Sequence, residues 1–191
     1  MRLVHLSNGN SKLGNIVNVN LPPILSCVRN VPCQHQGCYA LKAWRLYPNV
    51  RKVWSDNLDI LEQSRAGYFN GIVDQLRSKR KPVGFFRWHS SGDIIDQDYL
   101  NYMSEIARLF PLTRFLAFTK RNTLDVSALP DNLTVRFSYW PDYKPVIDQS
   151  FNTFAGLVGD ARISGYVCPG NCRVCRKCWS RVVRNVVFHK H

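Results

Sequence analysis

The distribution of cysteine constrains this chain more than any other feature of its sequence. All seven cysteines fall into two groups near the two ends of the chain. The groups are Cys27, Cys33 and Cys38, and then Cys168, Cys172, Cys175 and Cys178. An odd number of cysteines cannot all pair in disulfides, and cysteines that only filled a core would be scattered along the chain. The pattern therefore predicts that the thiols bind metal.

The spacing of the second group favours an iron–sulfur cluster over zinc. Zinc is usually held by two separated pairs of cysteines, whose four sulfurs converge on the ion at about 2.3 Å. Cys172, Cys175 and Cys178 instead follow one another at two-residue gaps, and such a run wraps around a larger group, as it does in bacterial ferredoxins. We expect one or two 4Fe–4S clusters, with structural zinc as the alternative metal.

The first group lies in a longer and looser loop, residues 27–38. Three thiolates on a four-iron cluster leave one iron without a protein ligand, and an open iron can bind a small molecule. The first group therefore suggests a catalytic site, whereas the four cysteines of the second group suggest an auxiliary or structural cluster. The alternative is a single cluster that takes its ligands from both groups.

Length and composition predict one folded domain. The chain has 191 residues, 45% of them hydrophobic and only 20% charged, which excludes a disordered tail protein. The first residues lack the apolar stretch of a signal peptide, and no apolar run reaches the roughly 20 residues that a membrane span requires. We expect a cytoplasmic protein with reduced thiols and no membrane partner.

The apolar patterning is typical of an α/β fold. It predicts a mostly irregular N-terminal segment, residues 1–26, with one short strand, then a short helix over Tyr39–Tyr47 that Pro48 stops. A long helix is expected to begin at Ser55 or Asp56 and to run to about Arg80. Three buried strands are then predicted over Val83–Trp88, Thr113–Phe118 and Leu133–Phe137, with a helix capped by Asp96 between the first two. This order predicts a parallel sheet.

Parallel sheets carry their chemistry in the loops that follow the carboxyl ends of the strands. The predicted strands are followed there by polar side chains. These are His89, Ser91, Asp93, Lys120, Arg121 and Ser138. Each of them has a plain alternative role, because polar residues also cap strands and helices.

Two resemblances follow from these motifs. Cys27, Cys33, Cys38-Tyr39, Ser90-Ser91-Gly92-Asp93 and the strand ending Thr119-Lys120-Arg121 resemble the first half of a radical-SAM-type partial barrel. The whole chain resembles, more closely, the phage family called gene-product-88-like. That resemblance rests on Asn10–Leu13, Cys38-Tyr39-Ala40, Arg87-x-His89-x-Ser91-Gly92-Asp93, Thr119-Lys120, Ser138, the C-terminal cysteine run with Trp179, and Phe188-x-x-His191.

The radical-SAM resemblance implies a fold, a cofactor and roles for residues. The fold is a partial (truncated) TIM-like barrel with parallel strands, a single α/β domain over residues 1–191 that ends in a cysteine-rich segment, residues 168–179. The cofactors are a cluster on Cys27, Cys33 and Cys38, and S-adenosylmethionine. The ligand is expected to lie against Ser91, Gly92, Asp93 and Ser138, with Asp93 and Lys120 as the catalytic residues.

The charge predicts a polyanionic partner. Lys and Arg number 26 against 13 Asp and Glu, a formal net charge of +13. The cations concentrate in residues 161–191, which contain no acidic residue, and in a second run from Arg77 to Lys81. Clusters held by thiolates offset only a few of these charges. We therefore expect nucleic acid, DNA or RNA, as the partner.

Three hypotheses on function follow. The first is a cluster-dependent enzyme of radical-SAM type that acts on or near nucleic acid. The second is a nucleic-acid-binding or processing protein with a structural cluster, including a nuclease whose divalent metal lies among Asp93, Asp96, Asp98 and Glu105; helix capping is the simpler role for Asp96 and Asp98. The third is a zinc-stapled interaction module.

Overall fold

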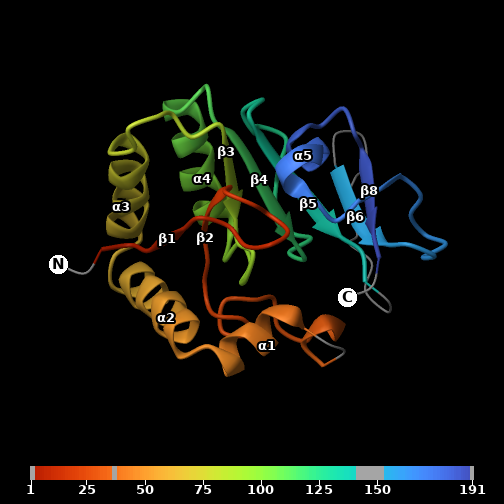
Figure 1. The fold of residues 1–191 in the computed structure, drawn as a ribbon, viewed down its shortest axis with the longest axis horizontal. Helices are drawn as coiled ribbons and strands as arrows, with labels where there is room; N and C mark the ends of the chain where they lie inside the picture. The colour runs from red at the N-terminus through yellow and green to blue at the C-terminus, as the bar shows by residue number, and fades with distance from the viewer. Residues whose placement is uncertain (1–2, 36–37, 141–152, 190–191) are drawn as a thin grey trace.

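The computed structural model describes residues 3–35, 38–140 and 153–189, and its centre is an eight-stranded sheet (Figure 1). The strand order is β1-β2-β3-β4-β5-β6-β8-β7. The strands are β1 (Leu6–Ser7), β2 (Val17–Val19), β3 (Phe85–Trp88), β4 (Arg114–Thr119), β5 (Leu133–Ser138), β6 (Thr153–Leu157), β7 (Tyr166–Val167) and β8 (Asn185–Phe188). β1 is antiparallel to β2, and the other pairings are parallel. The sheet is open, with β1 and β7 at its edges.

Helices cover the sheet unequally. They are α1 (Tyr39–Leu46), α2 (Pro48–Gln63), α3 (Arg65–Arg77), α4 (Gln97–Leu109) and the short α5 (Cys172–Cys175), with single 3₁₀ turns η1 (Pro32–Gln34) and η2 (Lys177–Trp179). Figure 1 shows α3 and α4 beside the β1–β4 half of the sheet, and α5 on the other side of β4. Within the described residues, no helix combines the length and the hydropathy that crossing a membrane requires.

Successive strand residues point to opposite faces of the sheet, and each face packs its own cluster. Phe86 and Trp88 of β3 and Phe115 of β4 pack with the apolar residues of α3 and α4. Leu116 and Phe118 of β4 face the other way and pack with the C-terminal cysteine segment. The strands are therefore buried on both faces, which explains their continuous apolar runs.

One predicted helix is wrong in its bounds. Ser55 and Asp56 do not begin a helix but lie in the middle of α2, which starts at Pro48. A proline is favourable at the first helical position, where no N–H is needed, so Pro48 separates α1 from α2 and starts the latter. The predicted single helix is also divided at Ser64, whose extended backbone and side chain cap α3 by accepting from Gly67 N at 3.0 Å.

The other predicted elements occur close to their predicted positions. The helix at residue 39, the three central strands and the helix capped by Asp96 are all present, and Asp96 Oδ1 accepts from Tyr99 N at 2.8 Å. Sequence patterning missed β6, β7 and β8, and it predicted one N-terminal strand where the structure has two. The α/β class and the parallel strands are confirmed, in an open sheet; a truncated barrel stays a prediction.

Candidate functional site at the carboxyl end of the sheet

A tight turn follows β3 and is bound to the segment that follows β2. His89 and Gly92 both have positive φ, 56° and 90°, so the chain reverses within residues 89–93. The side-chain oxygen of Asn20 accepts from Ser90 N at 2.7 Å and from Ser91 N at 3.2 Å. These bonds hold the two parallel strands' carboxyl ends together.

Leu21 and Ser26, in the segment that leads into the N-terminal cysteine loop, pack against this turn. A Cβ atom on Gly92 would lie 2.6 Å from Ser26 Oγ and 2.9 Å from Leu21 Cβ, so only glycine allows this segment to come so close. From the far end of the loop, Tyr39 Oη donates to the carbonyl oxygen of Ser90. The cysteine loop and α1 therefore lie at the carboxyl end of the sheet, at the lower end of the molecule in Figure 1.

The thiols of this loop share one electrostatic environment. The pKa of Cys27 rises to about 11, chiefly through burial; Asp93 and Cys38 also raise it, while a hydrogen bond with the Ile24 backbone and the charge of Lys120 act against them. Burial also raises the pKa of Cys33, against a lowering by the Lys120 ammonium, which hydrogen-bonds to that thiol. For Lys120 the burial effect on the pKa is downward, but Cys33 and Asp93 outweigh it. Cys27 and Cys33 thus both interact with Lys120 and with Cys38.

The Asp93 carboxylate is buried and accepts hydrogen bonds at both oxygens. Its Oδ1 accepts from Ile94 N at 2.7 Å and its Oδ2 from Lys120 N at 3.0 Å. Burial raises the pKa of Asp93, and hydrogen bonds from the Thr119 hydroxyl and the Lys120 backbone act against it. Asp93 therefore fixes the start of the loop that carries Lys120.

The second cysteine group follows the carboxyl end of β7 and packs on the sheet itself. It lies over the face of the sheet opposite α3 and α4, where Cys168 and Cys178 are buried among Leu116 and Val186. The Cys172 N–H donates to Lys12 O at 2.9 Å. A β-strand, β7, leads into this group and β8 follows it, so it is built into the sheet rather than appended as a tail.

Arg136 of β5 anchors the second group. Its side chain is fully buried and donates to the carbonyl oxygens of Cys178 (3.0 Å), Ser180 (2.8 Å), Val183 (2.8 Å) and Arg184 (3.1 Å). Burial lowers the pKa of Arg136, which the Cys178 thiol partly offsets. This cation therefore holds the polypeptide that follows the last cysteine.

Arg87 of β3 connects the two groups. Its guanidinium lies 4.1 Å from the centre of the Phe118 ring. Burial lowers its pKa, while Tyr39, Cys178 and Cys172 raise it. Cys168 and Cys175 raise the pKa of Cys172, and Cys168 and Cys172 raise the pKa of Cys178. The thiols of the second group therefore interact among themselves.

The structure brings several of the predicted carboxyl-end residues together. Asp93 and Lys120 interact with Cys27 and Cys33, Ser91 and Gly92 belong to the turn that holds Asp93, and Ser138 is the last residue of β5, paired with Ala155 of β6. His35 of the cysteine loop is exposed. Sequence reasoning missed Asn20; its signal is the alternation Val17-Asn18-Val19-Asn20, in which both asparagines are buried.

The acidic residues proposed for a divalent metal are used elsewhere. Both Asp96 and Asp98 accept from the Arg65 guanidinium, at 2.8 and 2.9 Å, and Asp96 caps α4. The capping role is confirmed for Asp96. Within residues 3–35, 38–140 and 153–189, no three His, Cys, Asp or Glu side chains are arranged to hold one metal ion, and the seven thiols are free.

The turn contains buried polar atoms without hydrogen-bond partners among the described residues. They are Trp88 Nε1, both ring nitrogens of His89, and the hydroxyls of Ser90 and Ser91. Buried polar groups are almost always hydrogen-bonded, so such a concentration in four consecutive residues marks a functional or hydrated region.

His89 makes the protein sensitive to acid. Burial, helped by Arg87, lowers the pKa of His89 from 6.5 to about 3. The unfolded chain binds this proton below pH 6.5 and the folded protein does not, so folding stability is complete above that pH and falls as the pH drops. Between pH 6.5 and pH 5 we expect a loss of about 2 kcal/mol of unfolding free energy from this group. His89→Asn, which tolerates the positive φ, should remove that loss.

Urea unfolding of both proteins at the two pH values measures the difference. A His89→Asn protein that loses as much stability as the wild type between these pH values would show that His89 does not carry the effect.

The comparisons with known proteins complete this description. The chain matches the family described as gene product 88 over residues 4–160. It belongs to the gene product 88 family. The matched range includes the N-terminal cysteine loop, the turn after β3 and Lys120, and it ends before the second cysteine group. No curated protein and no solved structure matches the chain, and none of the comparisons supports the resemblance to radical-SAM proteins.

Proposed function

We propose that this member of the gene product 88 family is an iron–sulfur protein. In the proposal, Cys27, Cys33 and Cys38 hold a four-iron cluster at the carboxyl end of the sheet. Cys168, Cys172, Cys175 and Cys178 hold a second cluster on the opposite face from α3 and α4. The observation that carries the proposal is that Cys27 and Cys33 both interact with Lys120 and with Cys38 at the edge where parallel sheets place their active sites.

The donor chemistry of both groups fits such clusters. Thiolates are the ligands that iron–sulfur clusters use, and each thiolate meets a different iron, so the sulfurs need not converge on one point as around a single ion. Arg87, Arg136 and Lys120 lie beside the two groups and would balance the negative charge of thiolate-bound clusters. Gly170 N donates to Cys168 Sγ at 3.4 Å, a bond that stabilises thiolate.

At the N-terminal site the protein's own groups have separate tasks in this proposal. A cluster with three thiolate ligands supplies an open iron to which a small molecule binds. Lys120 is the catalytic candidate, because its ammonium faces the thiols, while Asp93 positions it by accepting its backbone N–H. The unpartnered Ser91 hydroxyl is available to a ligand; S-adenosylmethionine is the one that the radical-SAM resemblance implies.

Metal analysis of anaerobically purified protein tests the proposal. We expect about eight irons and about eight acid-labile sulfides per chain, as two four-iron clusters require. The triple variant Cys27→Ser/Cys33→Ser/Cys38→Ser should retain about four of each, as should Cys172→Ser/Cys175→Ser/Cys178→Ser. His35→Ala, an exposed change within the N-terminal loop, is the matched control and should leave the iron content unchanged.

Other metal contents would contradict the proposal in distinct ways. Zinc without sulfide would replace it by the zinc-stapled module. About four irons, lost in both triple variants, would mean one cluster shared by the two groups.

Addition of S-adenosylmethionine to the reduced protein, followed by electron paramagnetic resonance, tests whether this ligand binds. An unchanged spectrum would exclude binding at the open iron.

A further inference from the structure

A basic groove lies at the opposite end of the sheet from the N-terminal cysteines. Its volume is about 830 Å³, and three segments line it: the loop before β2, the connection from α3 to β3, and α5 with the residue after it. The polar and charged lining residues are Asn8, Asn15, Lys79, Arg80, Lys81, Arg173 and Arg176. The first and last of these segments are far apart in the sequence, so the groove exists only in the folded protein.

Its charge is of one sign. Five cations line the groove and no Asp or Glu does. All five side chains belong to exposed residues, and among the described residues none of the five forms an ion pair. Like charges that are brought together without counter-charge repel one another, so this arrangement lowers the stability of the fold unless an anion binds.

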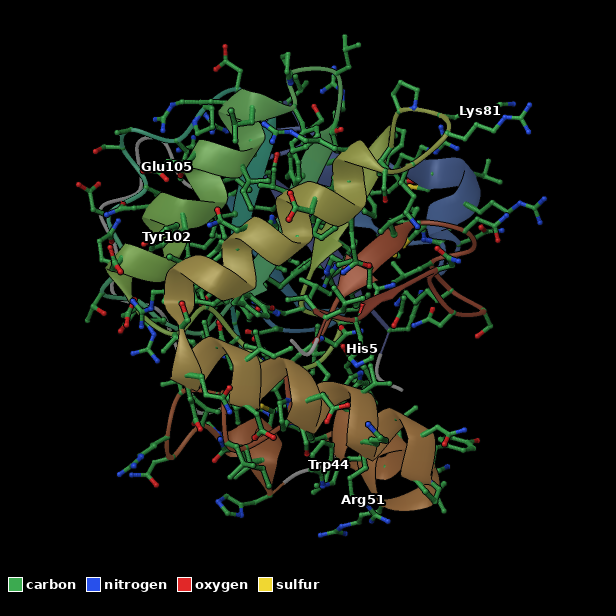
Figure 2. All side chains as sticks on the ribbon, turned by 90° about the vertical axis from the view of Figure 1, so that its left-hand side faces the viewer. His5, Trp44, Arg51, Lys81, Tyr102 and Glu105 are labelled. Carbon is green, nitrogen blue, oxygen red and sulfur yellow. The ribbon has the colours of Figure 1, made fainter. Side chains whose placement is uncertain are left out.

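The walls of the groove are held by specific contacts. Arg176 has a positive φ of 52°, and its guanidinium lies 4.5 Å from the centre of the Phe85 ring. The side chain of Arg173 packs over Gly14, where an added Cβ would lie 3.0 Å from Arg173 Cβ. Arg173 and Arg176 are therefore positioned by the fold, whereas Lys81 projects freely at the upper end of the molecule in Figure 2.

From these features we propose that the groove binds the sugar-phosphate backbone of a single-stranded nucleic acid. Arginine and lysine neutralise phosphates, and a recessed positive groove that tracks the backbone is the usual device for single strands. The groove is lined mainly by loops and by a helix of one turn, and among the residues that the structure describes no long helix or β-ribbon lines it that could enter the groove of a duplex. The proposal does not depend on the metal at either cysteine group.

Fluorescence anisotropy with labelled oligonucleotides tests the proposal. The probes are a dT oligonucleotide, a U oligonucleotide and a DNA duplex of the same length. The triple variant Lys79→Glu/Arg80→Glu/Lys81→Glu should bind the single strands at least about tenfold more weakly than the wild type and should show a shallower salt dependence, because fewer counterions are released. Arg173→Glu, on the facing wall, should weaken binding in the same direction.

The control variant changes the total charge by the same amount elsewhere. Lys42→Glu/Arg45→Glu/Arg51→Glu reverses three exposed cations of α1 and α2, and Figure 2 shows Arg51 at the end of the molecule opposite Lys81. This variant should retain binding within about threefold of the wild type. Equal weakening in both triple variants would overturn the proposal, since net charge alone would then explain binding. Tighter binding of the duplex than of either single strand would overturn it as well.

The iron content of the Lys79→Glu/Arg80→Glu/Lys81→Glu variant separates this inference from the proposed function. Normal iron with lost binding supports the groove independently. If the wild-type protein contains no iron but binds the single strands, the cluster proposal is wrong and the groove proposal stands.

Discussion

Replacing Arg136 by methionine is expected to destabilise the protein by about 3 kcal/mol or more, because each buried acceptor that loses its donor costs about 1–3 kcal/mol. Four carbonyl oxygens in residues 178–184 depend on this one guanidinium. Methionine fills much of the same volume but donates nothing. Since those residues connect the second cysteine group to β8, the C-terminal segment should separate from the sheet before the rest unfolds.

Urea unfolding and limited proteolysis measure the two effects. The variant should be cut after residue 178 under conditions in which the wild type is resistant. Arg114→Met is the matched control, because Arg114 lies on the neighbouring strand β4 and is exposed; it should change the unfolding free energy by less than about 0.5 kcal/mol. Equal stability of the two variants would show that the Arg136 hydrogen bonds do not hold the segment.

The second large effect is expected from Gly92→Ala. A side chain at a φ of +90° costs about 1–2 kcal/mol by itself. Here the methyl group would also meet Ser26 and Leu21 at 2.6 and 2.9 Å, and overpacking of that kind costs about 1–3 kcal/mol more. The segment that leads into the cysteine loop should move away from the turn and displace Cys27, so both stability and the iron content at the N-terminal site should fall.

Gly159→Ala separates the steric effect from the backbone effect. Gly159 has nearly the same φ, +88°, and nothing lies within 4 Å of the added Cβ. Differential scanning calorimetry should therefore show a larger loss for Gly92→Ala than for Gly159→Ala, and iron should be lost only from the former. Equal losses would mean that the close packing of Leu21 and Ser26 on Gly92 does not contribute to stability.

Much of the candidate site follows from local sequence patterns. The apolar runs before His89, Lys120 and Tyr139 predicted three parallel strands, and parallel strands bring the residues after their carboxyl ends together. The Asp96 cap was predictable because its interaction partner, Tyr99 N, is three residues away. Such features depend on residues that are close in the sequence, so they can be predicted from the sequence alone.

The tertiary structure decided what depends on distant partners. It inserted β8, a strand of only four residues, between β6 and β7. It placed the second cysteine group on the face of the sheet rather than at its edge, because Arg136, a lone cation in an apolar strand, bonds to carbonyls more than forty residues away.

Contacts between distant segments also form the two proposed sites, the N-terminal cysteine site and the basic groove. The sequence by itself determined the α/β class, the two cysteine groups and the excess of positive charge. Only the tertiary structure joined Lys79–Lys81 to Arg173 and Arg176 in one groove. At the other end it packed Leu21 and Ser26 against Gly92 and brought Cys33 to Lys120. Both junctions arise from close packing between segments that are separated by tens of residues, and packing of that kind leaves no periodic signal in the sequence.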